Sequence, residues 1–265
     1  MKSVFKFIGF GFLLCTLTGT SGFAQLSNYE IVDLSHEFSE ETIYWVTAKE
    51  FDLDTVFMGD TEKGYYYSAY DFATAEHGGT HLDAPIHFAK GMHSVEQIPL
   101  ENLLGSAIKI DVSEKALKDK DYQVSVNDLV AWEKQHGKIP DGSIVLLQTG
   151  YSQFYPDKEK YLGTRERGEE AVKLLHFPGL SPGAAKWLVN NRKIKSIGID
   201  TPSIDYGQSE LFESHVVLLS ENIPVFENLT ALEKLPAKDF DVIALPMKIK
   251  GGSGGPLRII ALLPK

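Results

Sequence analysis

Residues 77–87 read His77-Gly-Gly-Thr-His81-Leu-Asp83-Ala-Pro-Ile-His87, which places four metal-binding or proton-transferring side chains within one short stretch. His81 and Asp83 are two residues apart, so an extended backbone puts both side chains on one face. The two glycines after His77 argue against a helix and favour a turn that brings the backbone close to an ion. Imidazole and carboxylate ligands suit both Zn²⁺ and Mn²⁺. The stretch therefore predicts a metal site.

Strands and helices alternate on both sides of this stretch. A helix is expected from an N-cap at Ser125 to about His136, and a second is expected to open at Ser181-Pro182. The alternation predicts an α/β or α+β class with a mixed sheet, and the absence of linkers and repeats predicts a single domain. Strands are expected at 30–34, 65–75, 106–112, 143–149, 194–199, 241–247 and 257–263.

The first 24 residues have the build of a secretory signal peptide. Two lysines precede an apolar run at 7–17, and small residues lead to a cleavage point between Ala24 and Gln25. The run is too short to span a bilayer. We therefore expect an exported protein, periplasmic or secreted, with a folded domain over 25–265 and no membrane association after cleavage.

Charge and residue usage exclude several classes of function. The formal net charge of −10 disfavours nucleic-acid and anionic membrane surfaces as partners. The only cysteine, Cys15, lies inside the expected signal peptide, so the mature chain has no thiol nucleophile, thiolate ligand or disulfide. No G-x-S-x-G elbow is present. The glycine-rich segment 251–256 lacks the Lys-Ser/Thr pair of a phosphate loop and is interpreted as a tight connection into the last strand, passing near the site.

The stretch also matches the signature H-x-G-T-H-x-D-x-P-x-H, and the chain thereby resembles the metal-dependent cyclase family. That family includes bacterial kynurenine formamidases and is similar to the isatin hydrolases. The resemblance implies a mixed β/β/α, swivelling-domain-like cyclase fold over nearly all of the mature chain. Further segments that resemble the family are 33–36, 149–151, 177–180, 198–205 and 215–229.

The resemblance implies a set of metal ligands. His77, His81 and Asp83 would hold a first ion, and Glu227 would complete its shell. Glu227 and Asp83 would also bridge to a second ion bound by His215. Isatin hydrolases resemble this scheme with one metal and an amide side chain in place of Glu227. The carboxylate therefore favours a two-metal, formamidase-like site, with Zn²⁺ as the expected ion and Mn²⁺ as the alternative.

Two further residues receive roles from the same resemblance. His87 matches the family's proton donor and acceptor, a role for which a neutral-range pKa suits imidazole. Trp45 resembles an aromatic residue that packs against the substrate ring, although a purely structural role for it is a close alternative. After Trp45 the family continues with a Pro-Gly turn, whereas this chain has Val46-Thr47. This departure leaves the shape of the pocket wall open.

The expected function is that of an exported metal-dependent amidohydrolase, similar to the arylformamidases of tryptophan catabolism. A metal-activated water would attack a formyl-anilide carbonyl, with His87 moving the proton. The alternatives are an isatin hydrolase-like or lactonase-like enzyme acting on cyclic amides or esters, and a periplasmic metal- or ligand-binding module without turnover. The expected partner is a small aromatic amide or cyclic amide, and the resemblance implies a homodimer.

Overall fold

The computed structural model describes residues 26–265, and the expected signal peptide lies outside the described residues. Within this part, seven strands close into a barrel because β12 pairs with β11 along one edge and with β4 along the other. β5, β7, β9 and β10 run parallel, and the other pairings are antiparallel. In order around the barrel the strands are β12 (Gly254–Pro264), β11 (Phe240–Pro246), β5 (Leu104–Asp111), β7 (Ile144–Gln148), β9 (Ser196–Ile199), β10 (Val225–Glu227) and β4 (His81–Asp83).

β7 and β9 are buried at every residue, which explains their apolar runs in the sequence. In β7, Ile144 and Leu146 belong to the cluster inside the barrel, whereas Val145 and Leu147 pack toward the helices. The expected α/β class with a mixed sheet and a single domain is confirmed. The remaining sheet elements are β1 (Tyr29–Asp33), which extends the edge of β12, and the short pair β6 (Gln123–Val124) and β8 (Gly179–Leu180).

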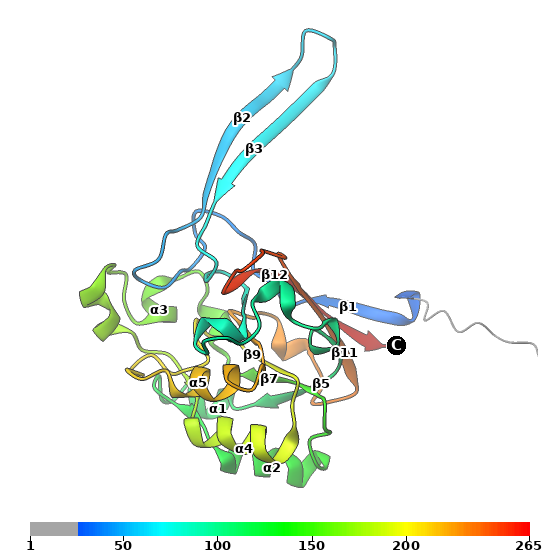
Figure 1. The fold of residues 1–265 in the computed structure, drawn as a ribbon, viewed down its shortest axis with the longest axis vertical. Helices are drawn as coiled ribbons and strands as arrows, with labels where there is room; N and C mark the ends of the chain where they lie inside the picture. The colour runs from blue at the N-terminus through cyan, green and yellow to red at the C-terminus, as the bar shows by residue number, and fades with distance from the viewer. Residues whose placement is uncertain (1–25) are drawn as a thin grey trace, which may run out of the picture.

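The two long helices, α2 and α4, lie together on one side of the sheet (Figure 1). Both begin at the residues that the sequence predicted: Ser125 forms a capping box with Asp128, and the Ser181 hydroxyl accepts a hydrogen bond from Ala184 N. None of the helices in the described part of the chain is long and apolar enough to cross a membrane. The helices are α1 (Ser113–Ala116), α2 (Val126–His136), α3 (Lys158–Leu162), α4 (Pro182–Arg192) and α5 (Glu213–Leu219).

A two-stranded hairpin, β2 (Asp52–Asp60) and β3 (Tyr66–Ala73), projects far from the barrel (Figure 1). Almost all of its residues are exposed on both faces. The sequence predicted β3 but not its partner. The hairpin leaves the body between Tyr44-Trp45 and His77, so both of its ends are close in sequence to expected site residues.

Candidate metal and active site

The centre of the site is strand β4, which lies between β10 and β12 where the barrel closes. His81 is directly opposite Glu227 in the β4–β10 ladder, so their side chains share a face. His81 Nε2 lies 3.1 Å from Asp83 Oδ1 and 3.4 Å from Glu227 Oε2. All three residues are at most 3% exposed. The extended conformation of 81–83 therefore puts His81 and Asp83 on one face, as the sequence predicted.

Two more histidines reach the same carboxylates from other elements. His77, just before β4, places Nδ1 2.6 Å from Asp83 Oδ1. His215, in the first turn of α5, places Nε2 2.9 Å from Asp83 Oδ2 and 3.2 Å from Glu227 Oε1. The structure thus brings together all five residues that the sequence assigned to metal binding.

Two of the imidazole rings, those of His81 and His215, are oriented by a hydrogen bond at the ring nitrogen that points away from the carboxylates (the outer nitrogen). His81 Nδ1 lies 2.9 Å from the carbonyl oxygen of Gly79, which can only accept, so Nδ1 carries a proton and Nε2 is the nitrogen available to a metal ion. His215 Nδ1 donates in the same way to Asp205 Oδ2 at 2.7 Å. Ligand histidines in metal sites are commonly fixed by such partners. Sequence reasoning assigned no role to Asp205, although this residue lies in a segment that resembles the family.

The buried charges of the cluster fit a divalent cation. Burial and the negative charge of Asp83 together raise the pKa of the Glu227 carboxyl. Burial alone would also raise the pKa of Asp83, but the charge of His77 and hydrogen bonds from the imidazoles outweigh it and hold that pKa well below its usual value. Two carboxylates this deep in the protein require compensating positive charge, and imidazole nitrogens with carboxylate oxygens are suitable ligands for Zn²⁺ or Mn²⁺.

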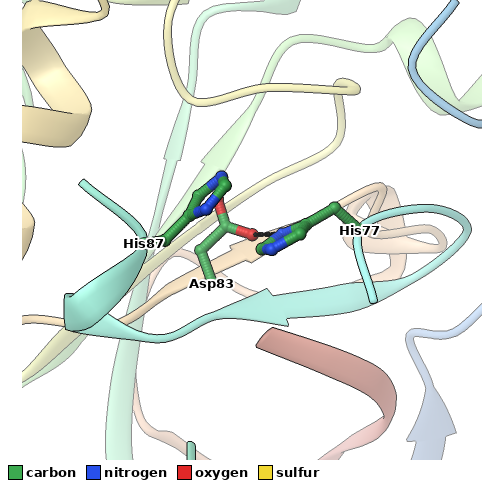
Figure 2. Close-up of side chains that lie close together, drawn as sticks. All are labelled: His77, Asp83 and His87. Carbon is green, nitrogen blue, oxygen red and sulfur yellow. Dashed lines mark hydrogen bonds and ion pairs between the residues drawn. The ribbon is translucent and has the colours of Figure 1, made fainter. Parts of the chain in front are cut away.

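His87 stands beside this cluster in the turn that follows β4 (Figure 2). Its ring stacks on His77 with centroids 3.9 Å apart. Ligand atoms of His77, Asp83 and His87 lie within 4.8 Å of one another, and so do those of His81, Asp83 and Glu227. Burial lowers the pKa of His87 to about 4, below the neutral range that the sequence suggested. The ring is therefore neutral at pH 7, and its role in proton transfer remains a prediction.

A cavity of about 310 Å³ opens over the histidines and carboxylates. Four aromatic residues form much of its wall: Tyr44, Trp45, Phe88 and Phe212. Trp45 stands edge-on to Phe212, with ring centroids 6.1 Å apart, so the two rings support each other. Sequence reasoning found Trp45 but missed Phe88 and Phe212, because nothing in their local pattern separates a pocket wall from a core.

The two glycines of the motif allow side chains of residues 38–44 to pack closely against the turn. A Cβ on Gly78 would overlap the ring of Tyr44, which is bridged to it by backbone pairing. Gly79 has φ +56° and would meet Phe38 and Thr42. The two glycines therefore leave room for the side chains of residues 38–44. Gly78 also lines the cavity, and a close approach of this backbone to an ion stays a prediction.

Comparison of the amino-acid sequence with known proteins identifies a family and several relatives. The family model described as putative cyclase matches residues 32–206. Isatin hydrolase from Roseibium aggregatum is 30% identical over 248 residues, 90% of this chain and 88% of that protein. Kynurenine formamidase from Salinibacter ruber is 26% identical over 231 residues, 87% of this chain and 96% of that protein.

The solved structures give the same result. Isatin hydrolase A from Labrenzia aggregata, bound to benzyl benzoate, superposes with a TM-score of 0.83 at 30% identity, covering 92% of this chain and 97% of that one. An isatin hydrolase bound to the product analogue thioisatinate gives a TM-score of 0.81 at 28% identity, covering 90% and 94%. The chain therefore belongs to the cyclase family and is a metal-dependent hydrolase of that family.

Proposed function

We propose that the protein hydrolyses the ring amide of an aromatic cyclic amide of the isatin class. The observation that carries the proposal is the aromatic cavity, whose walls lie directly against the histidine and carboxylate cluster. A flat aromatic lactam can pack against the cavity wall formed by Trp45 and Phe212 while its carbonyl faces the cluster. The similarity to isatin hydrolase over 90% of the chain supports the same substrate class.

The side chains divide the chemistry between them. His77, His81 and Asp83 would hold a divalent ion, Zn²⁺ or Mn²⁺, which when bound lowers the pKa of water toward ~7 and polarises a carbonyl. His87, neutral at pH 7 because burial lowers its pKa to about 4, accepts the proton of the attacking water. It then delivers that proton to the departing ring nitrogen, which is a poor leaving group unless protonated.

A second candidate is hydrolysis of an N-formyl anilide such as N-formylkynurenine. Glu227 favours it, because a second buried carboxylate opposite Asp83, with His215 between them, provides ligands for a second cation. On this proposal the protein resembles the kynurenine formamidases in its metal content.

The test is a substrate panel with protein beginning at Gln25, the proposed start of the exported chain, loaded with Zn²⁺ or with Mn²⁺. We expect isatin to be opened with a kcat/KM of ~10⁴ M⁻¹s⁻¹ or more, and N-formylkynurenine at least a hundredfold more slowly. The reverse order would support the second candidate. Bound metal without turnover of either compound or of a lactone would favour a binding module.

Two variants separate metal binding from proton transfer. His81→Ala removes a buried ligand and should abolish metal binding, measured by metal content after desalting. His87→Ala should retain the metal while turnover falls by ~10²–10⁴. Loss of metal from the His87→Ala protein would show that this histidine is a ligand.

We further propose that the protein acts as a homodimer. The exposed apolar hairpin β2–β3 supports this, because its side chains have no core to join within the described part of the chain.

A further inference from the structure

The glycine-rich segment before β12 passes directly behind His77. Ser253 Oγ lies 2.9 Å from His77 Nε2 and 2.7 Å from Glu76 Oε2. The backbone N–H of Ser253 donates to the same Glu76 oxygen at 2.9 Å. A continuous chain of hydrogen bonds therefore runs from Glu76 through Ser253 to His77, at the edge of the histidine and carboxylate cluster.

The direction of each hydrogen bond follows from the donor inventory. The Ser253 hydroxyl donates its single proton to Glu76 Oε2, which also accepts the backbone N–H of Ser253. Ser253 Oγ then has only lone pairs left for His77, and Nε2 of that ring must donate. Because Nε2 is committed to Ser253, Nδ1 is the nitrogen of His77 that remains for a metal ion. Nδ1 hydrogen-bonds to Asp83 Oδ1 at 2.6 Å, and a cation bound there would replace the proton between the two atoms.

We propose that Glu76 and Ser253 are positioning residues that hold His77 in the Nε2–H tautomer, so that Nδ1 serves as its metal ligand. His77 then uses the opposite nitrogen from His81 and His215, whose Nδ1 atoms are occupied by Gly79 O and Asp205. The three rings approach one cluster from three directions, and each has its own acceptor on the outer nitrogen.

The glycines on either side of Ser253 make this approach possible. A Cβ on Gly252 would lie 2.8 Å from Glu76 Oε1, and a Cβ on Gly254 would lie 2.6 Å from His77 Cε1. The Ser253 carbonyl accepts a hydrogen bond from Ala84 N at 2.8 Å, which ties the segment to the end of β4. Glycine is therefore needed at 252 and 254 because the backbone passes so close to Glu76 and His77, and this requirement is unrelated to phosphate binding.

The inference rests on the metal-binding part of the proposed function and is independent of the substrate. The first measurement is the Kd of metal-free protein for Zn²⁺, by competition with a chromogenic chelator. Ser253→Ala should raise this Kd by ~10–100-fold, as loss of an outer partner of a ligand histidine does in other metal sites. Glu76→Gln, whose amide oxygen can still accept, should raise it less.

The matched control is Ser106→Ala, which removes a serine-to-carboxylate hydrogen bond to Asp241 on the exposed surface of β5. Its Kd should equal that of the unmodified protein, and the melting temperatures of all metal-free variants should agree. Ser253→Ala protein that binds Zn²⁺ with unchanged affinity would overturn the inference, whereas failure of the unmodified protein to bind either Zn²⁺ or Mn²⁺ would instead overturn the proposed function.

A spectroscopic measurement tests the tautomer itself. In Zn²⁺-loaded, ¹⁵N-labelled protein, long-range ¹H–¹⁵N spectra of the imidazoles should show a protonated Nε2 and a metal-bound Nδ1 for His77. His81 and His215 should show the opposite pattern. The His77→Gln variant assigns the signal by its disappearance. A metal-bound Nε2 on His77 would contradict the proposal, whatever the affinities are.

Discussion

At the scale of single residues, hydrogen-bond partners outside the cluster decide how each histidine can act. His81 and His215 have an acceptor on Nδ1, so their Nε2 atoms face the carboxylates, while His77 has its acceptor on Nε2 and its Nδ1 faces Asp83. His87 has a stacked neighbour and no such acceptor among the described contacts. This difference supports a mobile-proton role for His87 and a ligand role for the other three.

His36 is a histidine near the site that should influence stability instead of chemistry. Its ring stacks on Tyr155 with centroids 3.7 Å apart, and its buried Nε2 has no hydrogen-bond partner among residues 26–265. Burial lowers the pKa of His36 to about 4 from the ordinary 6.5. As pH falls below 6.5, the unfolded chain takes up a proton here that the folded protein refuses until about pH 4. Stability is therefore lost as pH falls through this window.

His36→Phe keeps the stacked ring and removes the titration. Between pH 7 and pH 5 the original protein should lose about 2 kcal/mol more of its free energy of unfolding than the variant does. Urea denaturation of metal-free protein at both pH values measures this difference, and the comparison cancels the other titrating groups. Equal losses in the two proteins would show that His36 is protonated in the folded state at pH 5.

At the scale of elements, the site depends on the closure of the barrel by a three-residue strand. β4 pairs with β10 on one edge and with the first residues of β12 on the other. This arrangement brings Glu227 opposite His81 and places Ser253 behind His77. The metal ligands are thus held by backbone ladders, which is the rigid support that a preorganised site requires.

The turn into β4 gives a prediction at this scale. In Gly78→Ala the new Cβ would overlap the ring of Tyr44, which is 2% exposed and lines the cavity. We expect a loss of about 1–3 kcal/mol in the free energy of unfolding, as for other overpacked sites. The control is Gly183→Ala, where a Cβ in α4 meets nothing within 4 Å and should stabilise by up to ~1 kcal/mol. Denaturant titration of both variants distinguishes a steric effect from a general response to alanine.

The elements that could be predicted from the sequence are those marked by a pattern within a few neighbouring residues, such as an apolar run or a capping residue. β7 and β9 are apolar runs because both faces are buried, and α2 and α4 have capping residues at their first turns. β4 and β10 are three residues long, too short for periodicity, and their pairing joins residues far apart in the chain. β2 carries three consecutive apolar residues, Val56, Phe57 and Met58, which interrupt any alternation between apolar and polar residues.

The same distinction holds within the site. The residues at 77–87 could be predicted because ligand types at short spacing form a motif that resembles a known family. Glu76 and Ser253 could not, since the hydrogen bond between them spans 177 positions in the chain. Their function depends on where β12 begins in three dimensions, and no local pattern in the sequence encodes that.

At the scale of the whole molecule, the hairpin β2–β3 is the feature that the barrel does not explain. Both of its faces carry large apolar side chains, and an isolated two-stranded hairpin is marginally stable in water. The exposed fractions of these side chains range from 40% to 62%, for Leu53, Val56, Phe57, Met58, Tyr65, Tyr66, Tyr67, Tyr70 and Phe72.

The size of this surface matches what a dimer needs. Nine side chains of this size, each about half exposed, present roughly 800–900 Å² of mostly apolar surface. A standard interface buries about 800 Å² on each partner, and monomers rarely expose apolar patches beyond about 600 Å². We therefore expect the hairpin of each protomer to pack against a second copy of the chain.

Met58→Ser with Tyr66→Ser tests this expectation, because both residues lie on one face of the hairpin and are 62% and 61% exposed. Light scattering after gel filtration should show a dimer for the original protein and a monomer for the double variant. The control is Leu100→Ser, which removes an equally exposed apolar side chain outside the hairpin and should leave the dimer intact. A dimer that survives the double variant would place the interface elsewhere, and a monomeric original protein would mean that the hairpin is covered by something other than a second copy.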